Sequence, residues 1–249
     1  MSLLAIDNLS IALPKGADRE LAVKDVSFTL DKGEVLCIVG ESGSGKSMSA
    51  NALMGLLPEG VTPSAGSIHF EDRDLLTLSD DEMMALRGKD ISMIFQEPLS
   101  ALNPLMRVGD QIAEVFEAHD LLTPTERRKR ALELLHEVGL PDPDTTIRAY
   151  PFQLSGGQRQ RVVIAMALAL EPKILIADEP TTALDVTTQA QILDLIEDLR
   201  KRHGMAVLFI THDFGVVADI ADRVIVMQHG EVVEAGEAET VLLNPTHAY

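Results

Sequence analysis

Tryptophan is absent from this chain of 249 residues, and tyrosine and cysteine are rare, with two tyrosines and one cysteine. A single cysteine cannot form a disulfide bond within the chain, so the composition fits a reducing compartment. Cys37 lies within an apolar run, residues 35–39. We therefore expect a buried and unreactive thiol at this position.

Long apolar runs and positive charge are also scarce. The longest apolar run, residues 162–170, is much shorter than the ~20 residues that span a bilayer. The N-terminus carries neither a basic region nor a signal-peptide core, so we expect a cytoplasmic, soluble chain. Lysine and arginine number 21 against 39 acidic residues, which gives a net charge of −18. Such a charge argues against nucleic-acid binding, because that binding relies on basic side chains.

The sequence does contain a glycine-rich loop between a predicted strand, residues 34–39, and a predicted helix, residues 46–57. The loop matches the phosphate-loop pattern G-x-x-x-x-G-K-[ST] at every fixed position. Its glycines would let backbone N–H groups cradle phosphates, while Lys46 would reach the β- and γ-phosphates and Ser47 would bind Mg²⁺. The candidate nucleotide-binding residues of this loop are Gly40, Glu41, Ser42, Gly43, Ser44, Gly45, Lys46 and Ser47.

A second glycine pair lies in residues 154–158, Leu-Ser-Gly-Gly-Gln. Ser155 and Gln158 have the spacing of a capping box, so we expect a helix to begin there. Gly156 and Gly157 are poor helix formers, and two of them in a first turn favour a site of close backbone approach over an ordinary capped helix. Because helix N-termini bind anions, this segment is a second candidate phosphate site.

Asp178 and Glu179 follow a predicted buried strand, residues 173–177. Ligands of open α/β sheets bind beyond the carboxyl ends of the strands. Asp178 is predicted to hold Mg²⁺ through its water shell, and Glu179 is predicted to take a proton from the attacking water. An acidic turn at a strand end is the alternative, but the phosphate loop upstream favours the functional interpretation.

His212 and Gln96 are further candidates. His212 follows a predicted strand, residues 206–210, so we expect it at the same sheet edge, where an imidazole could bind the γ-phosphate and orient the water. Gln96 is predicted at the junction with a helical segment, where its amide could accept from a metal-bound water and donate to a phosphate. The alternatives are a structural histidine and a surface glutamine.

The order of these motifs resembles the nucleotide-binding domains of ATP-binding-cassette (ABC) transporters throughout the chain. Within that family, residues 95–104, 177–186 and 244–249 look like the oligopeptide and dipeptide importer ATPases. The resemblance implies a Mg²⁺-dependent ATPase in which two subunits, identical or different, close head to tail around two ATP molecules. Each ATP would lie between one chain's phosphate loop and the other chain's residues 155–158, and Asp185 would lie at the dimer interface.

The same resemblance implies uptake of peptides or similar small solutes through partner transmembrane permeases. A periplasmic solute-binding protein would be an indirect partner, and no nucleic acid would be bound. The chain would lie peripherally on the cytoplasmic face of the cell membrane. Residues 97–110 would lie in or near the groove that receives a coupling helix of the permease.

Two other functions within the family are weighed against this one. The first is a soluble ABC-type ATPase that acts on nucleic acid or the ribosome, which the lack of sustained heptads between Lys46 and Leu154 disfavours. The second is a non-catalytic regulatory cassette. It is disfavoured because the candidate catalytic residues are all present: Lys46, Asp178, Glu179 and His212.

The predicted fold class is α/β. It comprises a P-loop NTPase core with a mostly parallel sheet, an N-terminal antiparallel β subdomain and an inserted α-helical subdomain. We expect one ABC ATPase domain over residues 1–249, with the core and β subdomain in residues 1–97 and 171–249 and the helical subdomain in residues 98–170. The basic run at residues 127–130 is interpreted as the solvated face of a helix, with a binding patch as the alternative.

Two departures from the family pattern stand out. Family members usually carry an aromatic residue on an early strand that stacks on adenine, and Leu13 holds that place here. We therefore expect weaker adenine stacking. Relatives in the peptide group continue past the position of Tyr249, so we expect a truncated chain or one half of a tandem protein.

Overall fold

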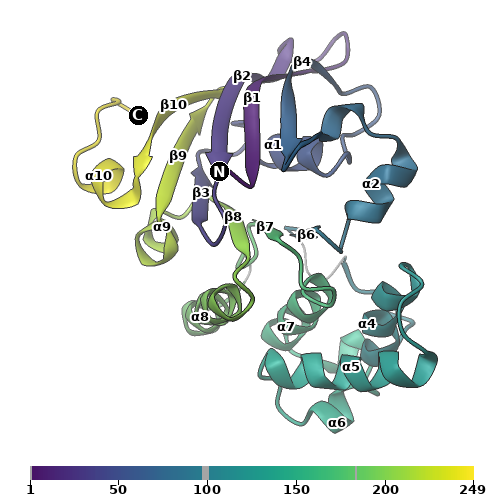
Figure 1. The fold of residues 1–249 in the computed structure, drawn as a ribbon. Coiled ribbons are helices and arrows are strands. Elements are labelled where there is room, and N and C mark those ends of the chain that lie inside the picture. Colours follow the sequence, from purple (N-terminus) through teal and green to yellow (C-terminus); the bar gives the residue numbers. More distant parts are fainter. Residues whose placement is uncertain (1, 97–100, 183) are drawn as a thin grey trace. The chain divides into compact units, whose positions relative to one another are not determined.

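The computed structural model describes residues 2–96, 101–182 and 184–249. Residues 97–100 and Ala183, which belong to motifs noted above, lie outside these ranges. The chain divides into two compact units (Figure 1). Unit 1 comprises Met1–Arg87 and Gly204–Tyr249, and unit 2 comprises Gly88–His203.

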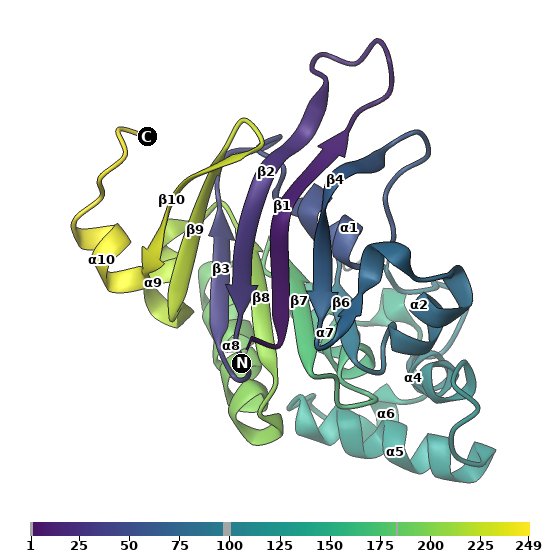
Figure 2. The same ribbon diagram turned by 45° about the horizontal axis from the view of Figure 1, so that its top comes forward.

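Unit 1 contains an antiparallel sheet with the strand order β2-β1-β4-β5 (Figure 2). Its strands are β1 (Leu4–Ala12), β2 (Leu21–Leu30), β4 (Thr62–Phe70) and β5 (Arg73–Asp74). Along β1 the buried side chains are Leu4, Ile6, Leu9 and Ile11. Buried residues occur at every second position on either side of Asn8, and the alternation shifts by one residue there. Asn8 has a left-handed φ of 50°. The β1–β2 register is irregular there, as at a β-bulge, so the same face stays buried on both sides of the shift.

Unit 1 also contains mainly parallel strands. β3 (Val35–Val39) pairs in parallel with β8 (Ala206–Thr211) on one side and with β9 (Arg223–Gln228) on the other. β10 (Glu231–Glu237) is antiparallel to β9. All five residues of β3 are buried, as expected of a central strand in a parallel sheet. The helices of this unit are α1 (Lys46–Leu53), η1 (Leu75–Thr77), α2 (Asp80–Leu86), α9 (Phe214–Ile220) and α10 (Ala238–Leu243).

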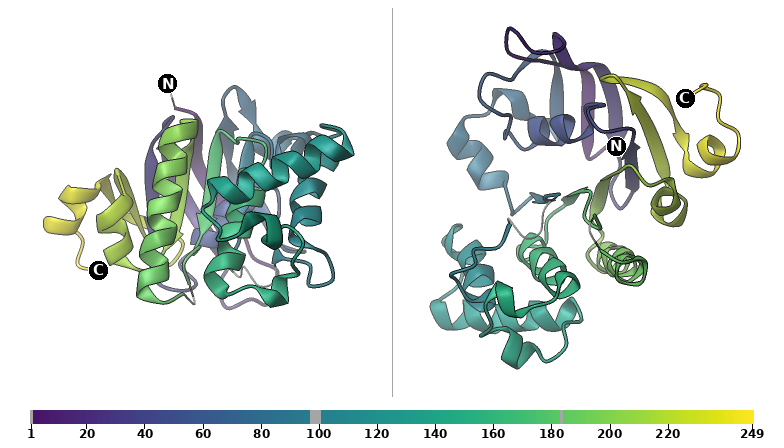
Figure 3. Two further views of the ribbon diagram at one scale, coloured as in Figure 1. Left: turned by 90° about the horizontal axis from the view of Figure 1, so that it is seen from below. Right: turned by 180° about the vertical axis from the view of Figure 1, so that it is seen from behind.

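Unit 2 consists of two parallel strands and several helices (Figure 3). The strands are β6 (Ile91–Ile94) and β7 (Ile174–Asp178). The helices are α4 (Val108–Glu117), α5 (Pro124–Glu137), α6 (Pro143–Thr146), η2 (Pro151–Gln153), α7 (Gly156–Ala167) and α8 (Val186–His203). Helices α4, α5 and α7 pack against one another, and the largest apolar side chains of their buried faces include Ile112, Phe116, Leu135 and Ile164.

The predicted α/β class is confirmed, with one antiparallel and one mostly parallel set of strands. The helix predicted for residues 46–57 ends earlier, at Leu53, because Gly55 adopts a left-handed φ of 62°. The division into a core and a helical subdomain at residues 98–170 remains a prediction.

Two further sequence-based expectations can be compared with the structure. Cys37 is fully buried, as predicted, and burial raises the pKa of its thiol to about 12. Among the described residues, none of the helices has the length and hydropathy needed to cross a bilayer.

Candidate functional site

The phosphate loop of unit 1 connects β3 to α1. Gly45 is the N-cap of α1, with a left-handed φ of 103°, and no side-chain cap is formed there within the described residues. A Cβ atom at Gly45 would lie 2.8 Å from the carbonyl oxygen of Ala22, and one at Gly40 would lie 2.2 Å from that of Met227. Backbone cannot move aside cheaply, so the loop conformation requires glycine at both positions.

Lys46 is buried inside this loop, with 5% of its surface exposed. Its ammonium group donates hydrogen bonds to the carbonyl oxygens of Gly40 at 2.7 Å and Glu41 at 2.9 Å. A buried cation, the N–H groups of a helix N-terminus and the Ser47 hydroxyl are the donor set that a nucleotide phosphate chain with Mg²⁺ requires. The residues present therefore fit ATP and its metal ion.

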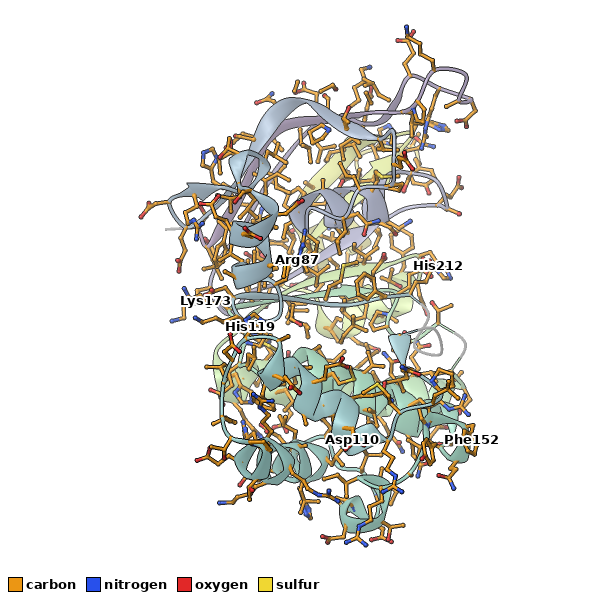
Figure 4. All side chains as sticks on the ribbon, turned by 90° about the vertical axis from the view of Figure 1, so that its right-hand side faces the viewer. Arg87, Asp110, His119, Phe152, Lys173 and His212 are labelled. Atoms are coloured by element: carbon orange, nitrogen blue, oxygen red, sulfur yellow. The ribbon has the colours of Figure 1, made fainter. Side chains whose placement is uncertain are left out.

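His212 (labelled in Figure 4) lies in the same unit, directly after β8. Val39, the last residue of β3, pairs in register with Thr211, the last residue of β8. Gly40 and His212 therefore both follow paired strand ends, at the same edge of the sheet. The His212 side chain is exposed there.

In unit 2 the structure brings Gln96 and Glu179 together. The amide Nε2 of Gln96 donates to Oε2 of Glu179 at 3.2 Å, and the hydroxyl of Thr182 donates to the same oxygen at 2.9 Å. β6 pairs in parallel with β7 at Ile94 and Ala177, so both residues lie two positions beyond a paired end. Two donors on one oxygen hold the carboxylate in place.

Two features of this cluster were not predicted. Glu179 adopts a left-handed φ of 48°, a conformation that is rare outside glycine, asparagine and aspartate and that concentrates at functional sites. Thr182, three residues after Glu179, supplies the second hydrogen bond. A hydroxyl three residues after a carboxylate is the feature of the sequence that could have indicated this hydrogen bond. Asp178, the last residue of β7, is buried with 5% exposure.

Residues 155–158 form the N-terminus of α7 as predicted. Ser155 is the N-cap: its hydroxyl accepts from the backbone N–H of Gln158 at 3.3 Å, and the Gln158 side chain accepts from the N–H of Ser155 at 2.9 Å. A Cβ at Gly157 would lie 2.7 Å from the Thr188 methyl group, while one at Gly156 would make only ordinary contact with Leu184. Packing within the chain therefore explains Gly157 but leaves Gly156 unexplained.

Asp185 lies at the start of α8. Its carboxylate accepts from the Thr188 hydroxyl at 2.7 Å and from the Thr188 backbone N–H at 3.0 Å. The hydroxyl first, and then the backbone N–H, lowers the pKa of Asp185 below its usual value. A cavity of about 460 Å³ lies beside it, lined by Gly139, Pro141, Ser155, Gly156, Gly157, Gln158, Arg161, Leu184, Asp185, Thr188 and Gln191. Arg161 was not predicted as a site residue.

Residues 2–96, 101–182 and 184–249 contain no preformed cage of protein ligands for a metal ion. No group of three or more histidine, cysteine, aspartate or glutamate side chains with suitable placement occurs within the described residues. Mg²⁺ is usually bound by one or two protein side chains, water and substrate phosphates. The described residues are thus compatible with an ion that arrives together with a nucleotide.

Residues 23–182 match the protein family described as "ABC transporter". A peptidoglycan transport ATP-binding protein of Agrobacterium fabrum is 54% identical over 99% of this chain, which covers 45% of that protein. An oligopeptide transport ATP-binding protein of Bacillus subtilis is 52% identical over 99% of this chain, which covers 69% of that protein. This chain therefore spans less than half the length of the first relative.

A solved structure of similar fold is the dimeric ATP-binding cassette MJ0796, in a post-hydrolysis state bound to ADP and Pi. It is 34% identical, with a TM-score of 0.82, over 94% of this chain and 98% of that chain. Similarity in sequence and similarity in fold both agree with the predicted resemblance.

Proposed function

The chain belongs to the ABC transporter family, and from this premise we propose that it is the ATP-hydrolysing subunit of a bacterial importer of peptides or similar small solutes. The supporting observation is that one chain carries both a phosphate loop around a buried lysine and a capped glycine helix start in residues 155–158. Relatives named for oligopeptide and dipeptide transport favour peptides as the solute class.

The nucleotide is ATP, held through its phosphates by the loop of residues 40–47. Lys46 exchanges the loop carbonyl oxygens for phosphate oxygens, because a charge-assisted hydrogen bond to phosphate is stronger than one to a neutral carbonyl. Ser47, Asp178 and Gln96 are the side chains that would hold Mg²⁺, directly or through water. The metal ion supplies charge neutralisation on the phosphates when it is bound.

Glu179 is the general base in this proposal. Its carboxylate takes a proton from the water that attacks the γ-phosphate, and the hydrogen bonds from Gln96 and Thr182 fix its orientation. His212 binds the γ-phosphate and helps to orient the water. Gln96 contacts the base and is also a candidate ligand in the water shell of the metal ion. It is therefore the residue that would transmit the presence of the γ-phosphate to the rest of unit 2.

The partners in this proposal are a second ABC ATPase subunit, with Asp185 and residues 155–158 at the interface, and transmembrane permeases. Exposed apolar side chains in unit 2 support a docking surface for the permease. Leu105 is 86% exposed and Phe152 (Figure 4) is 67% exposed. Tyr150 stacks on Phe152 with ring centroids 5.6 Å apart, which stiffens this surface. The chain would act peripherally at the cytoplasmic face of the membrane, with a periplasmic solute-binding protein as an indirect partner.

Uptake in the source cell tests this proposal. Cells whose own copy of the gene carries Lys46→Ala should lose uptake of at least one class of labelled di- to oligopeptide. Cells that carry Lys32→Ala, a change at an exposed lysine between β2 and β3, should retain it. Equal uptake of every peptide class by the two strains would contradict the importer assignment.

No observation favours the nucleic-acid or ribosome alternative.

A further inference from the structure

Arg19 reaches the phosphate loop from outside the motif. It lies in the connection between β1 and β2, and its Nη2 donates a hydrogen bond of 2.5 Å to the carbonyl oxygen of Gly43, in the middle of the loop. No sequence pattern marks this residue, because 24 positions separate the two partners.

The guanidinium of Arg19 is not fully satisfied in this arrangement. Its Nε is buried and has no hydrogen-bond partner, in contrast to Nη2. A buried N–H without an acceptor is costly, and in native proteins it calls for an explanation. An acceptor that arrives with a ligand would remove that cost.

A cavity of about 200 Å³ lies at this point, lined by Asp18, Arg19, Glu41, Ser42, Gly43, Ser44, Gln228 and His229. Arg19 is the only lysine or arginine among these described lining residues, whereas Asp18 and Glu41 contribute two carboxylates. Arg19 is therefore the side chain of this lining that offsets the two carboxylates toward an anion.

Lys46 provides a direct parallel within the same loop. Its ammonium also rests on loop carbonyl oxygens, those of Gly40 and Glu41. Two cations, one from inside the motif and one from outside it, thus use backbone oxygens of one loop as acceptors. A phosphate oxygen is a stronger acceptor than a carbonyl oxygen for either cation.

We propose that Arg19 is a nucleotide-binding residue whose guanidinium leaves the Gly43 carbonyl and donates to a phosphate oxygen of the bound nucleotide. This inference rests on the proposed binding of ATP by residues 40–47. It assigns a specific function to the β1–β2 connection, which holds a cation beside the phosphate loop before the nucleotide arrives. Arginine suits this position because its planar fork of donors can bind phosphate through two hydrogen bonds.

The test is calorimetric titration of the purified chain with Mg-ATP and, separately, with inorganic tripolyphosphate, which has no base or ribose. Arg19→Ala should weaken binding of both by at least about tenfold at low ionic strength, since hydrogen bonds to charged groups are among the stronger ones. Arg19→Lys should recover part of the loss, and Asp18→Asn should tighten binding. Arg73→Ala is the matched control, because Arg73 is an exposed arginine of the same unit that pairs with Glu82 at 3.7 Å.

The outcomes separate this inference from the proposed function. If Lys46→Ala loses binding and Arg19→Ala binds both probes like the wild type, Arg19 is not a ligand and the phosphate-loop assignment stands. If Arg19→Ala loses affinity for ATP alone, the phosphate contact is contradicted. If the wild-type chain binds neither probe, the proposed function itself fails. An unchanged melting temperature of Arg19→Ala shows that a loss of binding is not a loss of folding.

Discussion

Helix α1 in unit 1 begins at Gly45, which has no side chain to cap it, whereas helix α7 in unit 2 begins at Ser155, whose hydroxyl caps it. Both N-termini are rich in glycine. At the start of α1, Lys46 of the helix and Arg19 of the β1–β2 connection donate hydrogen bonds to carbonyl oxygens of the loop that precedes the helix. In α7 the capping box is complete within residues 155–158.

The difference indicates how each terminus can meet a phosphate. The start of α1 is arranged around cations that already lie in the loop, so it suits the full charge of a phosphate chain. The cap of α7 uses the N–H of Gln158, which leaves the N–H groups of Gly156 and Gly157 as donors. We infer that α7 contributes a weaker contact to phosphate, made by backbone N–H groups alone. Such a contact suits a segment that completes a nucleotide site formed mainly by other residues.

Lys46→Ala is the change expected to have the largest effect on the phosphate loop. It removes the buried ammonium, and ATP binding should fall below detection in a fluorescence titration. Lys32→Ala, which removes an exposed lysine of unit 1, should bind like the wild type. Unchanged binding by Lys46→Ala would contradict the role of the loop.

Glu179→Gln should separate binding from chemistry in unit 2. The amide can still accept hydrogen bonds from Gln96 and Thr182, but it cannot take a proton. We expect ATP to bind and phosphate release to slow by about 10²- to 10⁴-fold. Glu197→Gln, on α8 of the same unit, is the control and should leave turnover unchanged. Near-normal turnover in Glu179→Gln would move the role of general base to another residue.

Glycine substitutions should affect the two helix starts differently. Gly45→Ala places a Cβ 2.8 Å from a backbone oxygen at a φ of 103°, so thermal unfolding should show a loss of about 1–3 kcal/mol. Gly156→Ala meets only Leu184 at 3.7 Å and should change stability by less than about 0.5 kcal/mol.

The same pair of variants also tests function. If Gly156 faces a nucleotide, Gly156→Ala should hydrolyse ATP more slowly than the wild type while its melting temperature is unchanged. Wild-type hydrolysis by this variant would show that Gly156 is needed neither for packing nor for the proposed site.

The smallest effect concerns Asp185. Hydrogen bonds from Thr188 lower its pKa below the usual 3.8, so its contribution to stability is present above that value and is lost as the pH falls through the lowered pKa. Thr188→Val removes the hydroxyl and should raise the pKa of Asp185 toward 3.8. An NMR titration of the side-chain carboxyl carbon measures both values. A wild-type pKa at or above 3.8 would contradict the stabilisation of the Asp185 carboxylate by Thr188.

The strands whose burial is complete were predicted most directly. Residues 34–39, 173–177 and 206–210 were assigned as buried strands, and β3, β7 and β8 agree to within one residue at each end. An unbroken apolar run of five or six residues leaves little room for another interpretation. The helix start at Ser155 was predicted for an equally local reason, because a capping box involves only four residues.

Residues 58–94 were left without predicted elements, although they contain β4, β5, α2 and β6. The first five residues of β4 are exposed, so the strand shows no alternation to detect. α2 begins with a capping box of Ser79 and Glu82, and this local signal could have been found. The left-handed Glu179 and the contact of Arg19 with Gly43 arise from tertiary structure, which no local pattern encodes.

We propose that the two helix starts act on one nucleotide from different copies of the cassette. Light scattering of Glu179→Gln in Mg-ATP and in Mg-ADP tests it most directly, because this variant should bind ATP without consuming it. We predict the mass of a dimer in Mg-ATP and that of a monomer in Mg-ADP. A monomer in both nucleotides, under conditions in which ATP binding is saturated, would contradict the account.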